Sequence, residues 1–265
     1  MRYFFHAAYK GSSYRGWQKQ INAKSVQESI EDILSDFLKQ KVHCQGCGRT
    51  DAGVHSSQYY FHIDVNKEID NQLLFAINRM LPTDIAIYDI IKVDSRNHAQ
   101  HSACERTYNY FIHIEKNPFL NDISSLYNIE IDIEKMQIAA NLLIGDNDFR
   151  AFCKTPNRHN HTNCEIRKAQ FYIDQSGKFF RFEIRGNRFL KGMIRILMHE
   201  LIKVGENKIS IEEFHQCLRN KIPPKPLNLA YPQGLYLSKI AYPFLKQIPS
   251  KEFCPILKMH SWITI

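Results

Sequence analysis

Long hydrophobic runs are absent from this chain of 265 residues. No stretch approaches the ~18 consecutive apolar residues that a helix needs to span a bilayer. The segment Met1–Tyr9 also lacks the central apolar region of a secretory signal peptide. There is no low-complexity tract and no sequence repeat. We therefore expect a soluble cytosolic protein, in which a hydrophobic content of 44% suffices for a core.

Paired cysteines are lacking too. The seven cysteines are odd in number and scattered along the chain, which fits free thiols in a reducing compartment better than a disulfide framework. Acidic residues are outnumbered, since 35 Lys and Arg against 27 Asp and Glu give a net charge of +8. This excess favours a polyanionic partner such as nucleic acid. The alternative is a basic protein without such a partner, because net charge does not locate charges on the surface.

Apolar periodicity predicts alternating strands and helices in the first half of the chain. Strands are expected at Arg2–Tyr9, Tyr59–Asp64 and Ile85–Val93, and helices at Ser25–Lys39 and Ile69–Met80. The first helix begins at a Ser-x-x-Glu capping box. Its predicted buried face consists of Val26, Ile30, Ile33, Leu34 and Phe37.

The order begins again after Asp94–Ala103, a polar segment without either period that we interpret as a crossover. A hairpin is expected in the middle of the second half, because two apolar strands flank a turn containing Gly177. The predicted strands are Thr107–Ile114, Lys168–Asp174, Phe179–Arg185 and Gly234–Tyr242, and the predicted helices are Ile133–Leu143, Phe189–Val204 and Ser210–Leu218.

Both halves approximate the order β-α-β-β-α-β, with an extra helix in the second and a weakly indicated strand before residue 46 in the first. This order is typical of ferredoxin-like or RRM-like units. We therefore predict an α+β fold of two such units, residues 1–103 and 104–265, forming a mainly antiparallel sheet with helices on one face.

A glycine-rich stretch follows the first helix and surrounds one carboxylate, with the sequence Gly46-Cys47-Gly48-Arg49-Thr50-Asp51-Ala52-Gly53-Val54-His55. Glycine tolerates positive φ and lets other atoms approach closely, so this stretch predicts a tight turn presenting Asp51 and Arg49. A carboxylate presented in this way can be reached by a ligand and can take part in catalysis. In the alternative interpretation it bonds only its own backbone, as Asp in turns often does.

Two further patterns combine cations with apolar or aromatic surroundings. Arg106, Tyr108 and Tyr110 alternate along a predicted strand, so they share one face that suits an unstacked base. The alternative is that both tyrosines belong to the sheet core. Arg195 lies among apolar residues of a predicted helix, which indicates a buried partner rather than a solvated surface charge.

Together these segments resemble the motifs of the TruA family, the tRNA pseudouridine synthases A. The glycine-rich stretch is similar to the motif G-x-G-R-T-D-A-G-V-H, the segment beginning at Arg106 to R-x-Y-x-Y, and the segment ending at Arg195 to the family's third motif. Three more segments are similar to Y-x-G-W-Q, D-F-x-x-F and G-L-Y-L, at Tyr14–Gln18, Asp148–Phe152 and Gly234–Leu237. The resemblance thus extends over nearly the whole chain.

The resemblance implies the pseudouridine synthase fold and an isomerase that acts on the anticodon stem-loop of tRNA, as a homodimer and without cofactor or metal. It implies that Asp51 is the nucleophile, that Arg195 pairs with it, and that Tyr108 packs against the target base. Arg49 is a second candidate partner of Asp51. The residues expected to contact the substrate are Tyr108, Arg106, Arg15, Trp17, Gln18, His55, Arg150, Lys154 and Arg158.

The chain departs from the family pattern in places that bear on substrate choice. Where the family usually has F-H-A-R-F-S-A, this chain has Asn97-His98-Ala99-Gln100-His101-Ser102-Ala103. After Arg195 it has Ile196-Leu197-Met198 where the family has a glycine, and Leu229–Pro232 matches only in part. These changes leave the chemistry intact and the target uridine open.

Two other interpretations remain at this point. A non-catalytic RNA-binding protein of tandem RRM-like units would not need a carboxylate in a glycine loop. A zinc site could use Cys153, His159, His161 and Cys164, but their spacing matches no common zinc module. We expect this segment instead to form a basic loop facing phosphate, with Lys154, Arg158 and Arg167.

Overall fold

The computed structural model describes residues 1–70, 72–245 and 254–265. The chain divides into two compact units, each discontinuous in sequence. The first contains Met1–Cys104 and Tyr236–Pro255, and the second contains Glu105–Leu235 and Ile256–Ile265. The expected second half, residues 104–265, therefore differs from the observed unit, because Tyr236–Pro255 groups with the first unit.

The sheet of the first unit has the order β10-β3-β1-β4. Its strands are β1 (Arg2–Tyr9), β3 (His55–Asp64), β4 (Ile85–Val93) and β10 (Leu235–Ala241), and the short β2 (Gln45–Gly46) also pairs with β3. Neighbours are antiparallel except β10, which runs parallel to β3 with Tyr236 opposite His55. The short β2 is the strand that the sequence indicated only weakly.

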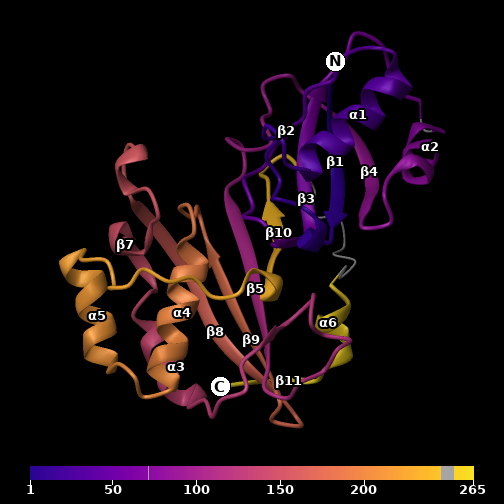
Figure 1. Ribbon diagram of the computed structural model, residues 1–265. Helices are drawn as coiled ribbons and strands as arrows, with labels where there is room; N and C mark the ends of the chain where they lie inside the picture. The colour runs from indigo at the N-terminus through magenta and orange to yellow at the C-terminus, as the bar shows by residue number, and fades with distance from the viewer. Residues whose placement is uncertain (71, 246–253) are drawn as a thin grey trace. The chain divides into compact units, whose positions relative to one another are not determined.

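Two helices cover one face of this sheet, α1 (Val26–Leu38) and α2 (Gln72–Met80), with a short 3-10 helix η1 at Gly11–Ser13 (Figure 1). Ser25 caps α1 by accepting a hydrogen bond from the Glu28 amide. The Glu28 carboxylate lies 3.4 Å from the Lys19 ammonium, and the full capping box predicted here is not formed. The predicted buried face is wrong at Phe37, which is 42% exposed because it lies in the last turn.

The crossover Asp94–Ala103 contains neither helix nor strand, as predicted, but it packs onto the first unit. Ala99 is fully buried, and its amide donates to Nδ1 of His62 at 3.2 Å. Its carbonyl accepts from the Tyr242 hydroxyl at 2.5 Å. Gln100 and His101, which follow it, are exposed.

The sheet of the second unit has the order β11-β8-β9-β5 with antiparallel neighbours. Its strands are β5 (Glu105–His113), β8 (Asn163–Asp174), β9 (Phe179–Gly186) and β11 (Trp262–Thr264), with β6 (Ser125–Leu126) beside β5 and β7 (Gly145–Asp148) beside β8. The predicted hairpin is confirmed as β8 and β9, with Gly177 at φ +72° in its turn. Strand β11 was not predicted.

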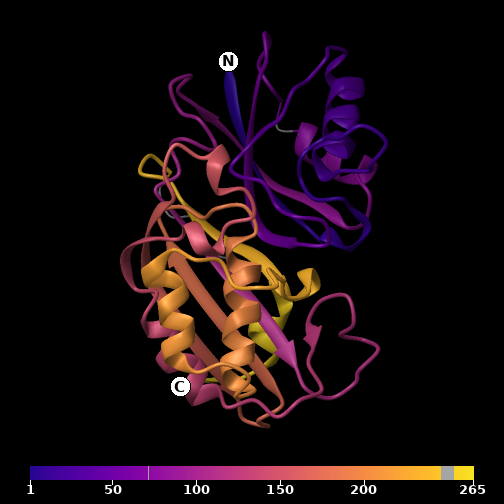
Figure 2. The ribbon, with the colours of Figure 1, turned by 60° about the vertical axis from the view of Figure 1, so that its left-hand side comes forward.

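Helices of the second unit gather on one face of that sheet (Figure 2). They are α3 (Ile133–Asn141), α4 (Met193–Gly205) and α5 (Ile211–Asn220), while α6 (Pro255–Met259) precedes β11 and 3-10 turns lie at Arg150–Phe152 (η2), Pro156–Arg158 (η3) and Pro232–Gly234 (η4). The predicted start of α4 at Phe189 is wrong, because Gly192 adopts φ +73° and places the helix start after it. Ser210 and Glu213 form a full capping box at the start of α5.

Each unit therefore contains antiparallel strands with helices on one face, which confirms the predicted α+β class. Stacked aromatic pairs form much of the core, with Phe5 on Phe61 in the first unit and Phe171 on Phe182 in the second, at centroid distances of 4.9 and 4.5 Å. Within the described ranges, no helix is long and apolar enough to cross a membrane.

Candidate active site

The glycine-rich stretch of the first unit connects β2 to β3 and forms the predicted tight turn. The amide of Val54 donates to the carbonyl of Asp51 at 3.2 Å, closing a turn in which Gly53 has φ +75°. Positive φ at the third turn position favours glycine. Asp51 is half-buried and Arg49 is exposed, so both are accessible on this loop.

A second loop, Lys10–Gln18, packs directly on the first one, backbone against backbone. The amide of Gly53 donates to the Tyr14 carbonyl at 3.2 Å, and the amide of Trp17 donates to the Thr50 carbonyl at 3.4 Å. A Cβ added to Gly16 would lie 2.3 Å from the Thr50 carbonyl oxygen. The two loops therefore interlock at a place where no side chain fits, and this contact fixes the backbone that carries Asp51.

Buried aromatic side chains pack against the protein side of the loop that carries Asp51. Trp17 is only 2% exposed and stacks on Tyr59 at a centroid distance of 4.1 Å. The Tyr59 hydroxyl donates to the Gly48 carbonyl at 2.5 Å, and the Tyr9 and Thr50 hydroxyls lie 2.9 Å apart. The expectation that Trp17 contacts the substrate is not favoured, because its ring is covered by the protein itself.

The expectation that His55 contacts the substrate is not favoured either. It is 1% exposed, its Nδ1 accepts from the Gly11 amide at 3.0 Å, and its ring stacks on Tyr236 at 4.5 Å. Its burial indicates that it anchors the end of the loop instead of touching RNA. Two other expected contacts in this unit remain available to a ligand, since Arg15 is exposed and Gln18 is half-buried, with its amide nitrogen 2.9 Å from Oε1 of Gln27.

The second unit carries the predicted tyrosine motif on β5. Arg106, Tyr108 and Tyr110 lie on one face, which is the predicted alternation. Tyr108 is 9% exposed and meets Phe189 edge-to-face at 5.2 Å, while Nη1 of Arg106 donates to the Asn187 carbonyl at 3.1 Å. Tyr108 and Tyr110 are both buried, so on this face the half-buried Arg106 is the side chain that solvent reaches.

Arg195 lies in the first turn of α4 and is half-buried. Its Nε donates to the carbonyl of Ala230 at 2.8 Å, and the amide of Ala230 donates back to the Arg195 carbonyl at 2.9 Å. The apolar surroundings of Arg195 predicted a buried partner, and the Ala230 carbonyl is one. A backbone acceptor of this kind leaves no signal in the sequence.

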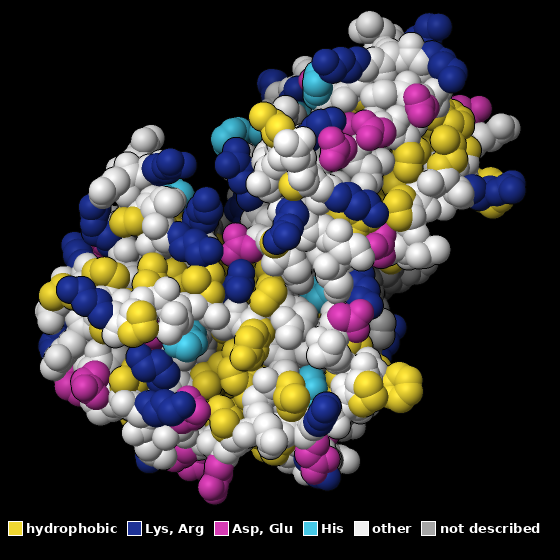
Figure 3. Space-filling model, in the orientation of Figure 1, with side chains coloured by type: hydrophobic (Ala, Val, Ile, Leu, Met, Phe, Trp, Pro, Cys, Tyr) yellow, Lys and Arg dark blue, Asp and Glu magenta, His cyan; other side chains and the backbone are white. Residues whose placement is uncertain are grey.

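The expected basic loop is exposed, with Lys and Arg side chains gathered over the segment above β7 (Figure 3). The backbone of Lys154 is fixed by a hydrogen bond from its amide to the Lys191 carbonyl at 3.1 Å. Arg150 donates to the Asn157 side chain. The exposed cations of this loop are Arg150, Lys154 and Arg158, whereas Arg167, also expected here, lies on β8 and pairs with Glu165 and Glu105.

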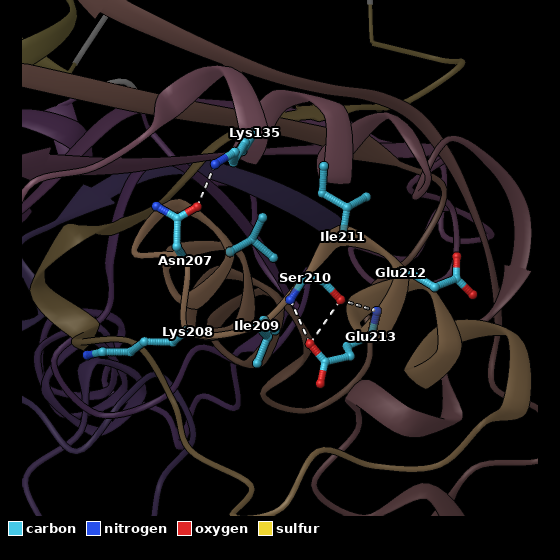
Figure 4. Close-up of a pocket in the computed structure, with 9 residues that line it drawn as sticks. Lys135, Asn207, Lys208, Ile209, Ser210, Ile211, Glu212 and Glu213 are labelled. Atoms are coloured by element: carbon cyan, nitrogen blue, oxygen red, sulfur yellow. Dashed lines mark hydrogen bonds between the residues drawn. The ribbon is translucent and has the colours of Figure 1, made fainter.

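Two other features of the described residues do not enlarge this site. No group of three or more His, Cys, Asp or Glu side chains there could hold a metal ion. A hollow of about 620 Å³ lies between the ends of α3, α4 and α5 (Figure 4). Its polar groups already have partners: Glu213 and Ser210 form the capping box, Lys135 reaches Asn207, and Lys208 and Glu212 bond Glu206 and Arg219.

Known proteins resemble this chain over almost its whole length. A family model described as tRNA pseudouridine synthase matches residues 139–243. A curated tRNA pseudouridine synthase A of Porphyromonas gingivalis is 35% identical over 246 residues, covering 91% of this chain and 97% of the relative. Proteins of the same name from Azobacteroides pseudotrichonymphae and Streptococcus pneumoniae are 36% and 33% identical, each over 91% of this chain.

The chain belongs to the tRNA pseudouridine synthase A family. This membership confirms the resemblance seen in the sequence motifs. The part matched by the family model includes Arg150, Lys154, Arg158 and Arg195. The tRNA pseudouridine synthase A motifs thus coincide here with a built loop around Asp51 in one unit, and with an aromatic strand and a clamped arginine in the other.

Proposed function

We propose that this chain is a tRNA pseudouridine synthase that isomerises uridine in the anticodon stem-loop, acting in the cytoplasm as a homodimer. The observation that carries the proposal is the similarity to curated tRNA pseudouridine synthases A over 91% of the chain. The accessible Asp51 on its interlocked loop, the Arg106–Tyr108 pair and the basic loop add chemical support.

The reaction breaks the bond between C1′ of the ribose and N1 of uracil and forms one between C1′ and C5. The C5 proton leaves and N1 gains a proton, so there is no net redox change. We propose that the carboxylate of Asp51 acts as nucleophile and that Tyr108 packs against the freed base. We propose Arg195 as the cation that accompanies Asp51, because Arg stays protonated at any working pH.

Asp51→Asn tests the nucleophile. We expect no pseudouridine in the variant, with RNA affinity and thermal stability nearly unchanged, since the amide keeps the size and shape of the carboxyl. Asp36→Asn is the matched control, an exposed carboxylate of the same unit on α1 that should not matter. An Asp51→Asn enzyme with appreciable turnover would end the assignment.

Arg195→Leu tests the cation. We expect losses of both turnover and stability, because a carboxylate without its charged partner is costly in a partly buried site. Melting and turnover equal to those of the unaltered protein would show that Arg195 does not serve Asp51.

Two further experiments address substrate and assembly. Mapping pseudouridine in the RNA of a deletion strain identifies the target, and RNA that is bound but never modified would favour the non-catalytic alternative. Light scattering at micromolar concentration tests the homodimer. A monomer that retains activity would refute it.

A further inference from the structure

The orientation of Arg195 is set by a short backbone segment. Nε of Arg195 donates to the Ala230 carbonyl, and the Ala230 amide returns a bond to the Arg195 carbonyl. The guanidinium group is planar, so fixing Nε also fixes the directions of its terminal nitrogens. Ala230 is 1% exposed, so water cannot replace it as acceptor. The residues that hold Ala230 therefore contribute to the orientation of Arg195.

Tyr110 holds the next residue along this segment. Its hydroxyl lies 2.8 Å from the Tyr231 carbonyl oxygen and 2.9 Å from Oγ of Ser125. A carbonyl can only accept, so in the shorter of these two contacts the Tyr110 hydroxyl is the donor to Tyr231. Burial holds the pKa of Tyr110 well above its usual range, so the phenol stays a donor at any working pH.

Two further contacts restrain the same segment. The Tyr127 hydroxyl lies 3.4 Å from both the Tyr110 hydroxyl and the Tyr231 amide nitrogen. Gly234 lies so close to β5 that an added Cβ would be 2.6 Å from the Phe111 carbonyl oxygen and from Oγ of Ser125. The segment from Ala230 to Gly234 thus packs on β5 and β6, and Tyr110 donates a side-chain hydrogen bond of 2.8 Å to it.

We propose that Tyr110 is a positioning residue for Arg195, acting through the Ala230–Tyr231 backbone, and that its hydroxyl sets the guanidinium orientation used in the isomerisation. This inference rests on the proposed role of Arg195 in the reaction. It predicts that the second tyrosine of the strand motif affects turnover without touching RNA.

Tyr110→Phe removes the hydroxyl and keeps the ring. Losing a hydrogen bond of ordinary strength corresponds to about a tenfold fall in kcat, with KM within about twofold. Tyr172→Phe is the matched control, because it deletes one hydroxyl bond of the same unit, 3.2 Å from Glu183, that does not lead to Arg195. This control should leave turnover unchanged.

An NMR measurement observes the positioning directly. In protein labelled with ¹⁵N-arginine, the Nε–H signal of Arg195 is assigned by its loss in Arg195→Lys. We expect Tyr110→Phe to shift this signal and speed its exchange with solvent, while the other arginine signals report that the fold is intact. Tyr172→Phe should leave the Arg195 signal in place.

A double substitution separates positioning from general loosening. Arg195→Lys lacks the Nε donor, so adding Tyr110→Phe to it should lower kcat no further. Independent losses that multiply, or an Arg195 signal unchanged by Tyr110→Phe, would overturn the proposal. Full turnover in Arg195→Leu would instead refute the proposed function of Arg195, and the Nε–H signal would still decide whether Tyr110 orients it.

Discussion

Replacing Gly16 by alanine tests whether the interlocked loops position Asp51. Gly16 has φ +91°, and an added Cβ would lie 2.3 Å from the Thr50 carbonyl oxygen and 3.1 Å from the Asp51 carbonyl carbon. Both neighbours are backbone atoms, so no side chain can rotate away. The alanine must therefore push the Thr50–Asp51 peptide out of place.

Gly177 provides a matched control. It has φ +72° in the β8–β9 turn, and no atom lies within 4 Å of an added Cβ. Gly177→Ala should cost only the left-handed backbone strain, about 1–2 kcal/mol. Gly16→Ala carries that strain and an overpacking cost of about 1–3 kcal/mol. In Gly16→Ala the free energy of unfolding should therefore fall by about 2–5 kcal/mol in total, as measured by urea denaturation.

Turnover should separate the two variants more sharply than stability does. A displacement of the reacting group by about 1 Å can cost on the order of 10²-fold in rate. We expect such a loss in kcat for Gly16→Ala, measured by pseudouridine formation at saturating tRNA and below the melting temperature. Gly177→Ala should turn over normally. Equal stability and equal turnover in the two variants would refute the idea that loop interlocking holds Asp51.

Three other outcomes are expected. Burial lowers the pKa of His62 to about 4, so between pH 6.5 and 4 the unfolded chain binds a proton that the folded one does not. As the pH is lowered through this range, the free energy of unfolding should decrease by up to about 1.4 kcal/mol per pH unit, and less steeply in His62→Gln. Gln100→Arg should tighten RNA binding and steepen its salt dependence by about one unit of slope, whereas an unchanged slope would place the crossover away from RNA. Chelators should leave turnover unchanged, and zinc near one equivalent by elemental analysis would redirect attention to Cys153 and its neighbours.

Helices and strands with a clear apolar period were predictable, because the spacing of their apolar residues indicates which side chains are buried. Arg2–Tyr9 and Ile85–Val93 are strands with the predicted bounds. What failed depends on the backbone or on context. Gly192 delays α4 through its positive φ, and β11 has only three residues, too few to show a period.

The candidate site was predictable in its chemistry and less so in its architecture. Glycines around a carboxylate indicated the Asp51 turn correctly. A sequence motif gives the residue type at a position but does not show whether its side chain faces solvent. Trp17 and His55 were therefore expected to contact substrate, although both are buried. The acceptor of Arg195 is the backbone carbonyl of Ala230. Every residue has such a carbonyl, so the residue type at position 230 could not predict this bond.

The pairing of β10 with β3 has a consequence for how the protein matures on the ribosome. Ser56 and Leu237 are joined by a hydrogen bond across 181 positions, and the neighbouring His55 stacks on Tyr236. The loop that carries Asp51 is thus made early in synthesis, while the strand that braces its end emerges late. A nascent chain that stops before Tyr236 would contain the nucleophile without this support, so translation must pass that point before the loop is fully braced.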